Sequence, residues 1–261
     1  MKRFSVSCIG TYETCGYKCL RQYNKIGEDK LEDDKNFYGE FGALLHDLFD
    51  KHYKEGLTQE QMTDMFYNAL TDLECEFPDG KKEQYINDAL EQFDYFYDKY
   101  ANIIPVATEE EFEDFYIEGI DLPWKGFIDR IDGSIEDKSI VISDYKTGRS
   151  SKFTKRELSD NVQATVYSLY YKQKYGFYPD SFVFIFTKER KTKEIEINEA
   201  FIERGLARIR RSVKAMEQGI FLPEAKGGKY FCKNFCKYYE ECPKYIKSND
   251  GWDLKSESTN K

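Results

Sequence analysis

The chain has 261 residues, of which 40% are hydrophobic and 16% aromatic. This composition excludes an intrinsically disordered chain and is typical of a folded domain. No apolar stretch approaches the roughly 20 residues that a membrane span needs, and "MKRFSVSCIG" lacks the apolar region of a secretory signal. We therefore expect a cytoplasmic protein with no membrane partner, built as one core with a small appended unit.

The formal net charge of -9 argues against a uniformly basic nucleic-acid-binding protein. The charge is nevertheless segregated along the chain. Residues 83–121 carry twelve acids and one base, whereas residues 146–193 carry eleven Lys and Arg and four acids, interleaved with Phe and Tyr. The second stretch predicts a basic patch suited to phosphate, although a solvated charged surface has the same pattern.

The first hundred residues carry apolar side chains at helical spacing, and Ser7 is a candidate N-cap for the first helix. Helices are predicted at residues 8–23, 39–56, 61–77 and 84–100. They indicate a helical region over about residues 1–105.

Strand patterns dominate the next part of the chain, and short turn signals between the first three indicate an antiparallel meander. Strands are predicted at residues 110–120, 124–133, 139–147, 181–187 and 193–198, and helices at 155–175 and 199–217. The order α-β-β-β-α-β predicts an α/β fold with a mixed sheet. We expect a single domain over residues 1–245, made of the helical region, a core at about 106–220 and a cysteine segment at about 228–245, followed by a flexible tail at 246–261.

The stretch "VISDYKTGRS" ends an apolar strand with an acid and a lysine. Because side chains alternate along a strand, Asp144 and Lys146 share a face. If residues 136 and 137 form a two-residue turn, Asp129 of the preceding strand lies directly opposite Asp144. Two facing carboxylates destabilise a sheet unless a cation lies between them, which predicts a site for Mg²⁺ or Mn²⁺.

An amine beside two metal-binding carboxylates can orient or deprotonate an attacking water and stabilise charge on a phosphate. Asp129, Asp144 and Lys146 therefore predict phosphodiester hydrolysis. The alternative interpretation is a surface ion pair between Asp144 and Lys146, with Asp129 unrelated to it.

These residues belong to a longer pattern: G-x-x-D in "GFIDRID", D-x-K in "DYKTG" and Q-x-x-x-Y in "QATVY". The pattern resembles the RecB-like branch of the PD-(D/E)XK nuclease superfamily. The positions that match are Gly126, Asp129, Asp144, Lys146, Gln163 and Tyr167. The resemblance implies a restriction-endonuclease-like core and a metal-dependent DNA exonuclease with catalytic roles for Asp129, Asp144, Lys146, Gln163 and Tyr167. Taken alone, Gln163 and Tyr167 share a helical face and fit ordinary packing equally well.

His46 lies beside the apolar face of a predicted helix, where a histidine is more often a core residue than a ligand. The resemblance implies instead that Gly42 and His46 form the family's glycine and histidine pair. It further implies a metal shell of His46, Asp129, Asp144 and the backbone carbonyl of Tyr145. An acid from the first strand is also a family feature, for which we favour Glu111 among Glu109, Glu110, Glu111 and Glu113.

Seven cysteines include three in one compact segment, "FCKNFCKYYEECP", which indicates a soft metal ligand set. Cys8, Cys15 and Cys19 all lie near one face of the first predicted helix, so helical geometry does not choose a fourth ligand. The resemblance to CRISPR-associated and AddB-type exonucleases implies a structural 4Fe-4S cluster held by Cys15, Cys232, Cys236 and Cys242. A structural Zn²⁺ is the alternative. The spacing of the first two C-terminal cysteines and the glycine at position 16 depart from the usual family pattern.

The basic loop after the D-x-K motif is the candidate for contacts with the DNA backbone. Its residues are Arg149, Lys152, Lys155 and Arg156. We expect hydrolysis at DNA ends or in single strands during recombination, repair or phage DNA processing. The sequence has no P-loop, so a helicase motor would be a separate chain. We expect DNA as the substrate and a helicase, a recombinase or an integrase as a possible protein partner. Two alternatives stay open: a CRISPR-adaptation nuclease that trims DNA with an integrase, and a catalytically inactive DNA-binding module of the same fold.

Overall fold

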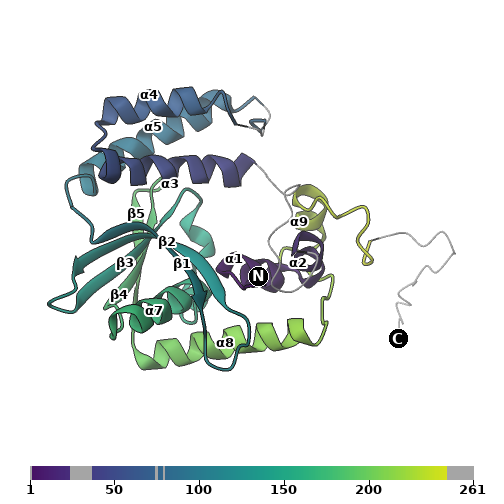
Figure 1. Cartoon of the computed structure of the whole chain (residues 1–261). Helices are drawn as coiled ribbons and strands as arrows, with labels where there is room; N and C mark the ends of the chain where they lie inside the picture. Colours follow the sequence, from purple (N-terminus) through teal and green to yellow (C-terminus); the bar gives the residue numbers. More distant parts are fainter. Residues whose placement is uncertain (1, 24–36, 74–75, 79, 246–261) are drawn as a thin grey trace, which may run out of the picture.

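The computed structural model describes residues 2–23, 37–73, 76–78 and 80–245. Within them, one mixed sheet in the order β1-β2-β3-β4-β5 has helices over both faces (Figure 1). The strands are β1 Ala107–Phe115, β2 Trp124–Ser134, β3 Ser139–Lys146, β4 Ser181–Phe186 and β5 Lys191–Glu196. The first three strands form an antiparallel meander, β4 is parallel to β3, and β5 is antiparallel to β4. The predicted α/β fold with a mixed sheet is confirmed.

Helices α3, α4 and α5 cover one face of the sheet, α7 and α8 cover the other, and α1, α2 and α9 lie beside it (Figure 1). The helices are α1 Val6–Thr14, α2 Gly16–Tyr23, α3 Phe37–Glu55, α4 Gln59–Ala69, α5 Lys82–Lys99, α6 Lys155–Leu158, α7 Val162–Tyr175, α8 Glu199–Glu217 and α9 Gly228–Phe235, with a 3-10 turn at Ser150–Lys152. None of the helices in the described ranges combines the length and apolar character that a membrane crossing requires.

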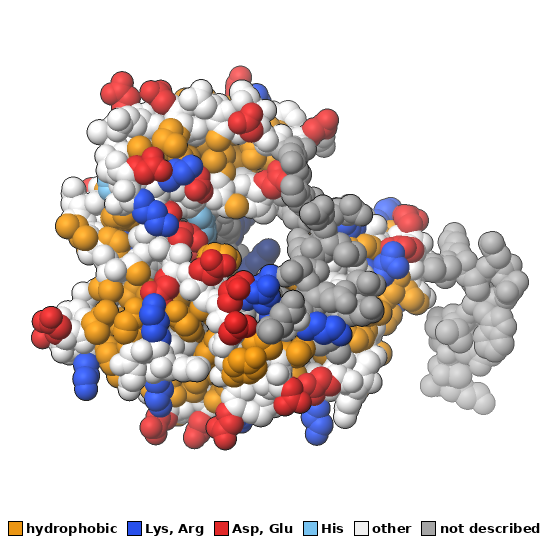
Figure 2. Space-filling model, viewed as in Figure 1, with side chains coloured by type: hydrophobic (Ala, Val, Ile, Leu, Met, Phe, Trp, Pro, Cys, Tyr) orange, Lys and Arg blue, Asp and Glu red, His pale blue; other side chains and the backbone are white. Residues whose placement is uncertain are grey.

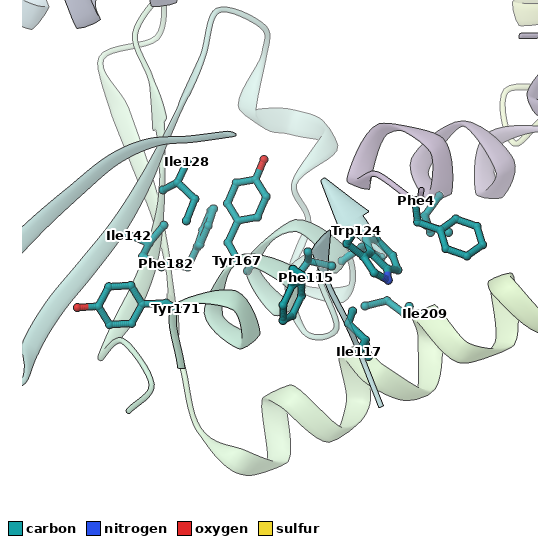
Figure 3. Close-up of a cluster of buried hydrophobic side chains, with 14 of the residues drawn as sticks. Phe4, Phe115, Ile117, Trp124, Ile128, Ile142, Tyr167, Tyr171, Phe182 and Ile209 are labelled. Atoms are coloured by element: carbon teal, nitrogen blue, oxygen red, sulfur yellow. The ribbon is translucent and has the colours of Figure 1, made fainter. Parts of the chain in front are cut away.

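Alternation along the strands divides the buried side chains between the two faces of the sheet. On the α7 and α8 side, Ile142 and Phe182 join a cluster that also holds Tyr171 and Ile209 (Figure 3). On the other side, Tyr145 and Ile185 pack with the apolar faces of α3, α4 and α5. The central strands β3 and β4 are therefore buried on both faces, which fixes their register and the positions of the polar side chains at their ends.

Two predicted helices are each divided in the structure. The helix predicted over residues 8–23 breaks at Cys15, whose backbone is extended, and its N-cap is Ser5 rather than Ser7. Residues 155–175 form two helices because the Asn161 side chain caps a new helix at the backbone N–H of Ala164. Ser, Thr and Asn compete for backbone hydrogen bonds, and this local competition was not visible in the apolar periodicity. The predicted tail at 246–261 and Cys75 lie outside the described residues.

Candidate active site

The β2–β3 ladder brings the two predicted aspartates to the same end of the sheet. Its pairing runs from Ser134 with Ser139 to Arg130 with Ser143, so Asp129 and Asp144 follow directly beyond the last pair. The predicted register is confirmed up to that pair. The connection is a four-residue loop, 135–138, rather than a two-residue turn.

Three side chains form a group with metal-ligand spacing at this end of the sheet. Ligand atoms of His46, Glu109 and Asp129 all lie within 4.8 Å of one another. His46 Nδ1 is 3.2 Å from Asp129 Oδ2, and the same oxygen accepts a hydrogen bond of 2.8 Å from the Tyr145 N–H. Two carboxylates and one imidazole suit Mn²⁺ and also Mg²⁺, whose remaining ligands are waters and phosphate oxygens.

Strand register decides which of the four upstream glutamates joins this group. Thr108 pairs with Arg130 and Glu110 with Ile128, so Glu109 lies opposite Asp129. The structure thus brings Glu109 into the group, whereas the sequence favoured Glu111, which pairs with Phe127.

The other two glutamates have partners elsewhere. Glu110 forms a 2.9 Å ion pair with Lys174 of α7, and Glu113 forms an ion pair with Arg3. Neither is therefore available to the metal group.

The backbone conformation and the pKa of Glu109 both indicate a constrained environment. Its φ of 44° is in the left-handed region, which strains a residue other than glycine. Burial, and after it the charge of Asp129, raises the pKa of Glu109 to about 7. A cation bound here would relieve that repulsion. A positive φ inside a strand has no signal in the sequence, so sequence reasoning could not select this residue.

Lys146, Asp144 and Gln163 form a polar network next to the metal group. Lys146 Nζ lies 2.6 Å from Asp144 Oδ2 and donates a 3.1 Å hydrogen bond to Gln163 Oε1, while the Gln163 amide donates to Asp144. The contact at Oδ2 is an ion pair without hydrogen-bond geometry, so this buried oxygen has no hydrogen-bond partner among the described residues. Burial raises the pKa of Asp144 to about 6, although Lys146 opposes the shift.

His46 faces the same charges. Burial alone would lower its pKa, but the carboxylates of Asp129 and Asp144 outweigh burial and raise the pKa above its usual value. The two carboxylates therefore favour a positive charge at the centre of the site, either on the His46 ring or on a cation bound in its place.

Two glycines permit the close approach of the elements that carry these residues. A Cβ on Gly126 would lie 2.6 Å from the Phe112 ring of β1 and 3.3 Å from the Tyr167 ring of α7, so only glycine lets the Phe112 ring pack here without displacement. A Cβ on Gly42 would lie 3.3 Å from the Thr147 hydroxyl. Gly42 thereby lets α3, which carries His46, pass close to the end of β3.

Arg130 links the helical region to the sheet directly beneath the site. Its side chain is fully buried, pairs with Asp132 at 2.6 Å and donates to the Tyr53 hydroxyl of α3 and the Ile103 carbonyl. It also lies 3.5 Å from the Tyr145 hydroxyl. Because His46 and Tyr53 share α3, Arg130 helps to hold the histidine helix against the strands that bear the carboxylates. The sequence motif did not reveal this role.

A cleft of about 920 Å³ opens over the site. Besides His46, Glu109, Asp129, Lys146, Gln163 and Tyr167, it is lined by acids and bases in similar number: Asp47, Asp50 and Glu111, and Arg3, Lys54 and Lys125. Figure 2 shows red and blue side chains side by side around the hollow centre of this face. The cleft is therefore not uniformly basic.

The predicted basic loop lies apart from this cleft. Arg149, Lys152, Lys155 and Arg156 are exposed, and none of them lines the cleft. Arg156 lines a separate cavity of about 480 Å³ around Arg208. The three cleft bases Arg3, Lys54 and Lys125 were missed because they are scattered along the sequence and only the fold gathers them.

The predicted cluster cysteines converge from the two ends of the described chain. Burial raises the pKa of the Cys236 thiol, and the charges of Cys232 and Cys15 add to the shift. Burial and the charge of Glu241 raise the pKa of the Tyr17 hydroxyl, and Cys242 and Cys236 add to that shift. Cys8 and Cys19 instead belong to the main hydrophobic core, where the Cys19 thiol lies 3.7 Å from the Cys8 carbonyl.

Gly16 has a clear structural reason beside this cysteine group. A Cβ there would lie about 3.0 Å or less from the backbone of Phe221 and Leu222, so only glycine lets that segment run against the start of α2. The Tyr17 N–H donates to the Leu222 carbonyl at 3.1 Å in the same place. The departure from the usual family pattern at position 16 is therefore a packing requirement of this chain.

Comparison with known proteins agrees with this geometry. The family model of the PD-(D/E)XK nuclease superfamily matches residues 3–243, so the chain belongs to this superfamily. No curated protein matches the chain. A solved structure from Eubacterium rectale, named "Putative exonuclease", resembles the chain with a TM-score of 0.55 and 16% identity, covering 89% of this chain and 87% of that one. This likeness establishes the shared fold, a restriction-endonuclease-like core, and with the family it supports a nuclease.

Proposed function

We propose that the protein is a metal-dependent DNA exonuclease of the RecB-like branch. The observation that supports this most strongly is the group of His46, Glu109 and Asp129, with ligand atoms within 4.8 Å, beside the Asp144 and Lys146 ion pair in an open cleft. Hard oxygen ligands next to an ammonium group suit a phosphodiester in a metal-assisted hydrolysis.

A divalent cation held by His46, Glu109 and Asp129 would supply Lewis-acid activation of the phosphate and of a water. Side chains of the protein perform the remaining steps. Lys146 orients the water and stabilises negative charge on the phosphate, and Asp144 and Gln163 fix its ammonium group. Tyr167, packed under Gly126, supports the strand that carries Asp129.

A structural 4Fe-4S cluster held by Cys15, Cys232, Cys236 and Cys242 is the second part of the proposal. These four cysteines come from both ends of the described chain, and a structural Zn²⁺ is the alternative occupant. Either group would join the N-terminal helices to the C-terminal segment.

DNA cleavage with the Lys146→Ala variant tests the proposed activity. Labelled single- and double-stranded DNA is incubated with Mn²⁺, and we expect the variant to be slower by about 10²- to 10³-fold. Lys99→Ala, which removes an exposed lysine of α5, is the matched control and should match the native protein. Equal products from native protein and Lys146→Ala would refute the enzymatic claim.

Circular DNA separates exonuclease from endonuclease activity. A linear single strand should be degraded, whereas a covalently closed circle of the same sequence should survive. Cleavage of the circle at a similar rate would contradict the exonuclease part of the proposal. A helicase, recombinase or integrase partner and a cytoplasmic location stay predictions.

A further inference from the structure

One aromatic side chain in the cleft is exposed next to the metal group. Phe127 has 49% of its surface exposed and lines the cleft, although the four residues that follow it on β2, 128–131, are all buried. The ring is therefore open to a ligand that enters the cleft.

Strand geometry fixes the place of this ring relative to the chemistry. Lys125, Phe127 and Asp129 alternate on β2 and all line the cleft, so they form a row on one face. Neighbours in such a row are about 6.8 Å apart along the strand. The row thus offers a cation, an aromatic face and a metal-binding carboxylate in sequence.

That order matches the chemistry of a nucleotide chain, in which phosphates alternate with flat bases. A phosphate bound near Asp129 leaves the adjacent base within reach of Phe127, and Lys125 can attract the next phosphate. The cross-strand partner of Phe127 is Glu111. An acid beside the ring disfavours an apolar protein partner and is compatible with the amino groups of a base.

A base inside a duplex can use this ring only after it leaves the stack. In a duplex both faces of a base are stacked on its neighbours, and withdrawing it costs a few kcal/mol. The cleft volume of about 920 Å³ is within the range of small-ligand sites, about 300–1,000 Å³, and is large enough for a few nucleotides.

We propose that Phe127 stacks on an unpaired base adjacent to the scissile phosphate, and that the site therefore takes single-stranded or frayed ends as its substrate. This inference rests on the proposed nuclease function and specifies its substrate class. Phe127 is a specificity-determining residue that contacts substrate without taking part in bond cleavage.

A double-mutant cycle, which combines a substitution in the protein with an abasic substitution in the oligonucleotide, tests the proposal. Affinity for a single-stranded 12-mer is measured with Ca²⁺ in place of Mn²⁺, for native protein and Phe127→Ala, with an abasic nucleotide placed at each position in turn. We expect Phe127→Ala to weaken binding of the intact strand by about 5- to 150-fold. The loss should disappear when the abasic nucleotide occupies one particular position.

Three variants make the result specific to stacking. Phe127→Trp should keep native affinity, whereas Phe127→Leu should lose most of it despite remaining apolar. Tyr116→Ala removes an aromatic residue of similar exposure, 52%, outside the cleft, and should bind as the native protein does.

Each outcome has a defined meaning. Equal affinities for native protein and Phe127→Ala, or a loss that persists on every abasic strand, would overturn the stacking role, even if the protein cleaves DNA. If Phe127→Ala fails to fold, native affinity in Phe127→Leu overturns it instead. A native protein that shows the stacking pattern but never cleaves in Mn²⁺ would refute the nuclease proposal and leave this inference standing.

Discussion

The nuclease cleft and the cysteine group are built by different means. In the cleft, the carboxylates and Lys146 lie on paired strands, and hydrogen bonds from the protein itself hold Asp129 and Lys146. The cysteine group depends on the short helix α9, on turns, and on a few contacts such as the 3.0 Å ion pair between Arg21 and Glu241. A sheet pre-organises a site, whereas a loop segment needs its cofactor to become rigid.

Removal of a ligand of the proposed 4Fe-4S cluster should produce the largest effect, and that effect should be confined to the cysteine group. In Cys232→Ser we expect the free energy of unfolding to fall by several kcal/mol and Tm by about 10 °C or more. Mn²⁺ affinity of the cleft, measured by calorimetry, should stay within a few-fold of native. Tyr230→Ala, an exposed substitution on α9, is the control.

If the cleft and the cysteine group unfold together, the two regions are not organised independently. A loss of Mn²⁺ binding in Cys232→Ser protein that is still folded would show that the sheet does not pre-organise the site by itself. An unchanged Tm and an unchanged iron content would remove the cluster from the proposal.

Arg130→Met should destabilise the contact between the helical region and the sheet next to the cleft. The substitution leaves Asp132 and the Tyr53 hydroxyl without their buried partner, so we expect a loss of about 3–5 kcal/mol in the free energy of unfolding in urea. Arg130→Lys should recover only part of it because one nitrogen cannot replace the guanidinium fork. Native stability in Arg130→Met would mean that this arginine does not join the helical region to the sheet.

Metal binding in the cleft should depend on pH through Glu109. A carboxylate binds a cation as the anion, so a pKa raised to about 7 means that protons compete with the metal below pH 7. We expect Mn²⁺ affinity to be about tenfold weaker at pH 6 than at pH 8 from this group alone. Calorimetry on Glu109→Gln should give weaker binding with a flatter pH dependence, and an equally steep dependence would exclude Glu109 as the titrating ligand.

A pair of glycine substitutions gives the smallest effect and distinguishes packing from helix propensity beside the cysteine group. A Cβ at Gly10 of α1 meets nothing within 4 Å, so Gly10→Ala should stabilise the protein by about 0.5–1 kcal/mol. Gly16→Ala should destabilise it because the new Cβ would overlap the backbone of Phe221 and Leu222. Urea unfolding of both variants checks the difference, and stabilisation by both would show that segment 221–222 is not packed against α2.

Local sequence signals were sufficient to predict the order of the strands along the chain and to identify the motif residues. The α/β fold follows from alternation and apolar runs, and the helix predicted at 199–217 is Glu199–Glu217 in the structure. The proximity of Asp129 and Asp144 follows from the symmetric spacing around the 135–138 loop. These features are local because they depend on side chains a few residues apart and on one hairpin.

Tertiary structure decided the features in which distant segments meet. Glu109 rather than Glu111 joins the metal group because β1 pairs with β2 in a register that no local pattern encodes. Capping at Asn161 overrode apolar periodicity in the helix predicted over residues 155–175. Arg130 and Phe127 belong to the same predicted strand, and the strand pattern does not say which of the two side chains is buried. Packing against α3 buries Arg130, whereas the ring of Phe127 stays open to the cleft. The physical reason is that burial and charge pairing are properties of the assembled layers, which a linear pattern of side chains does not contain.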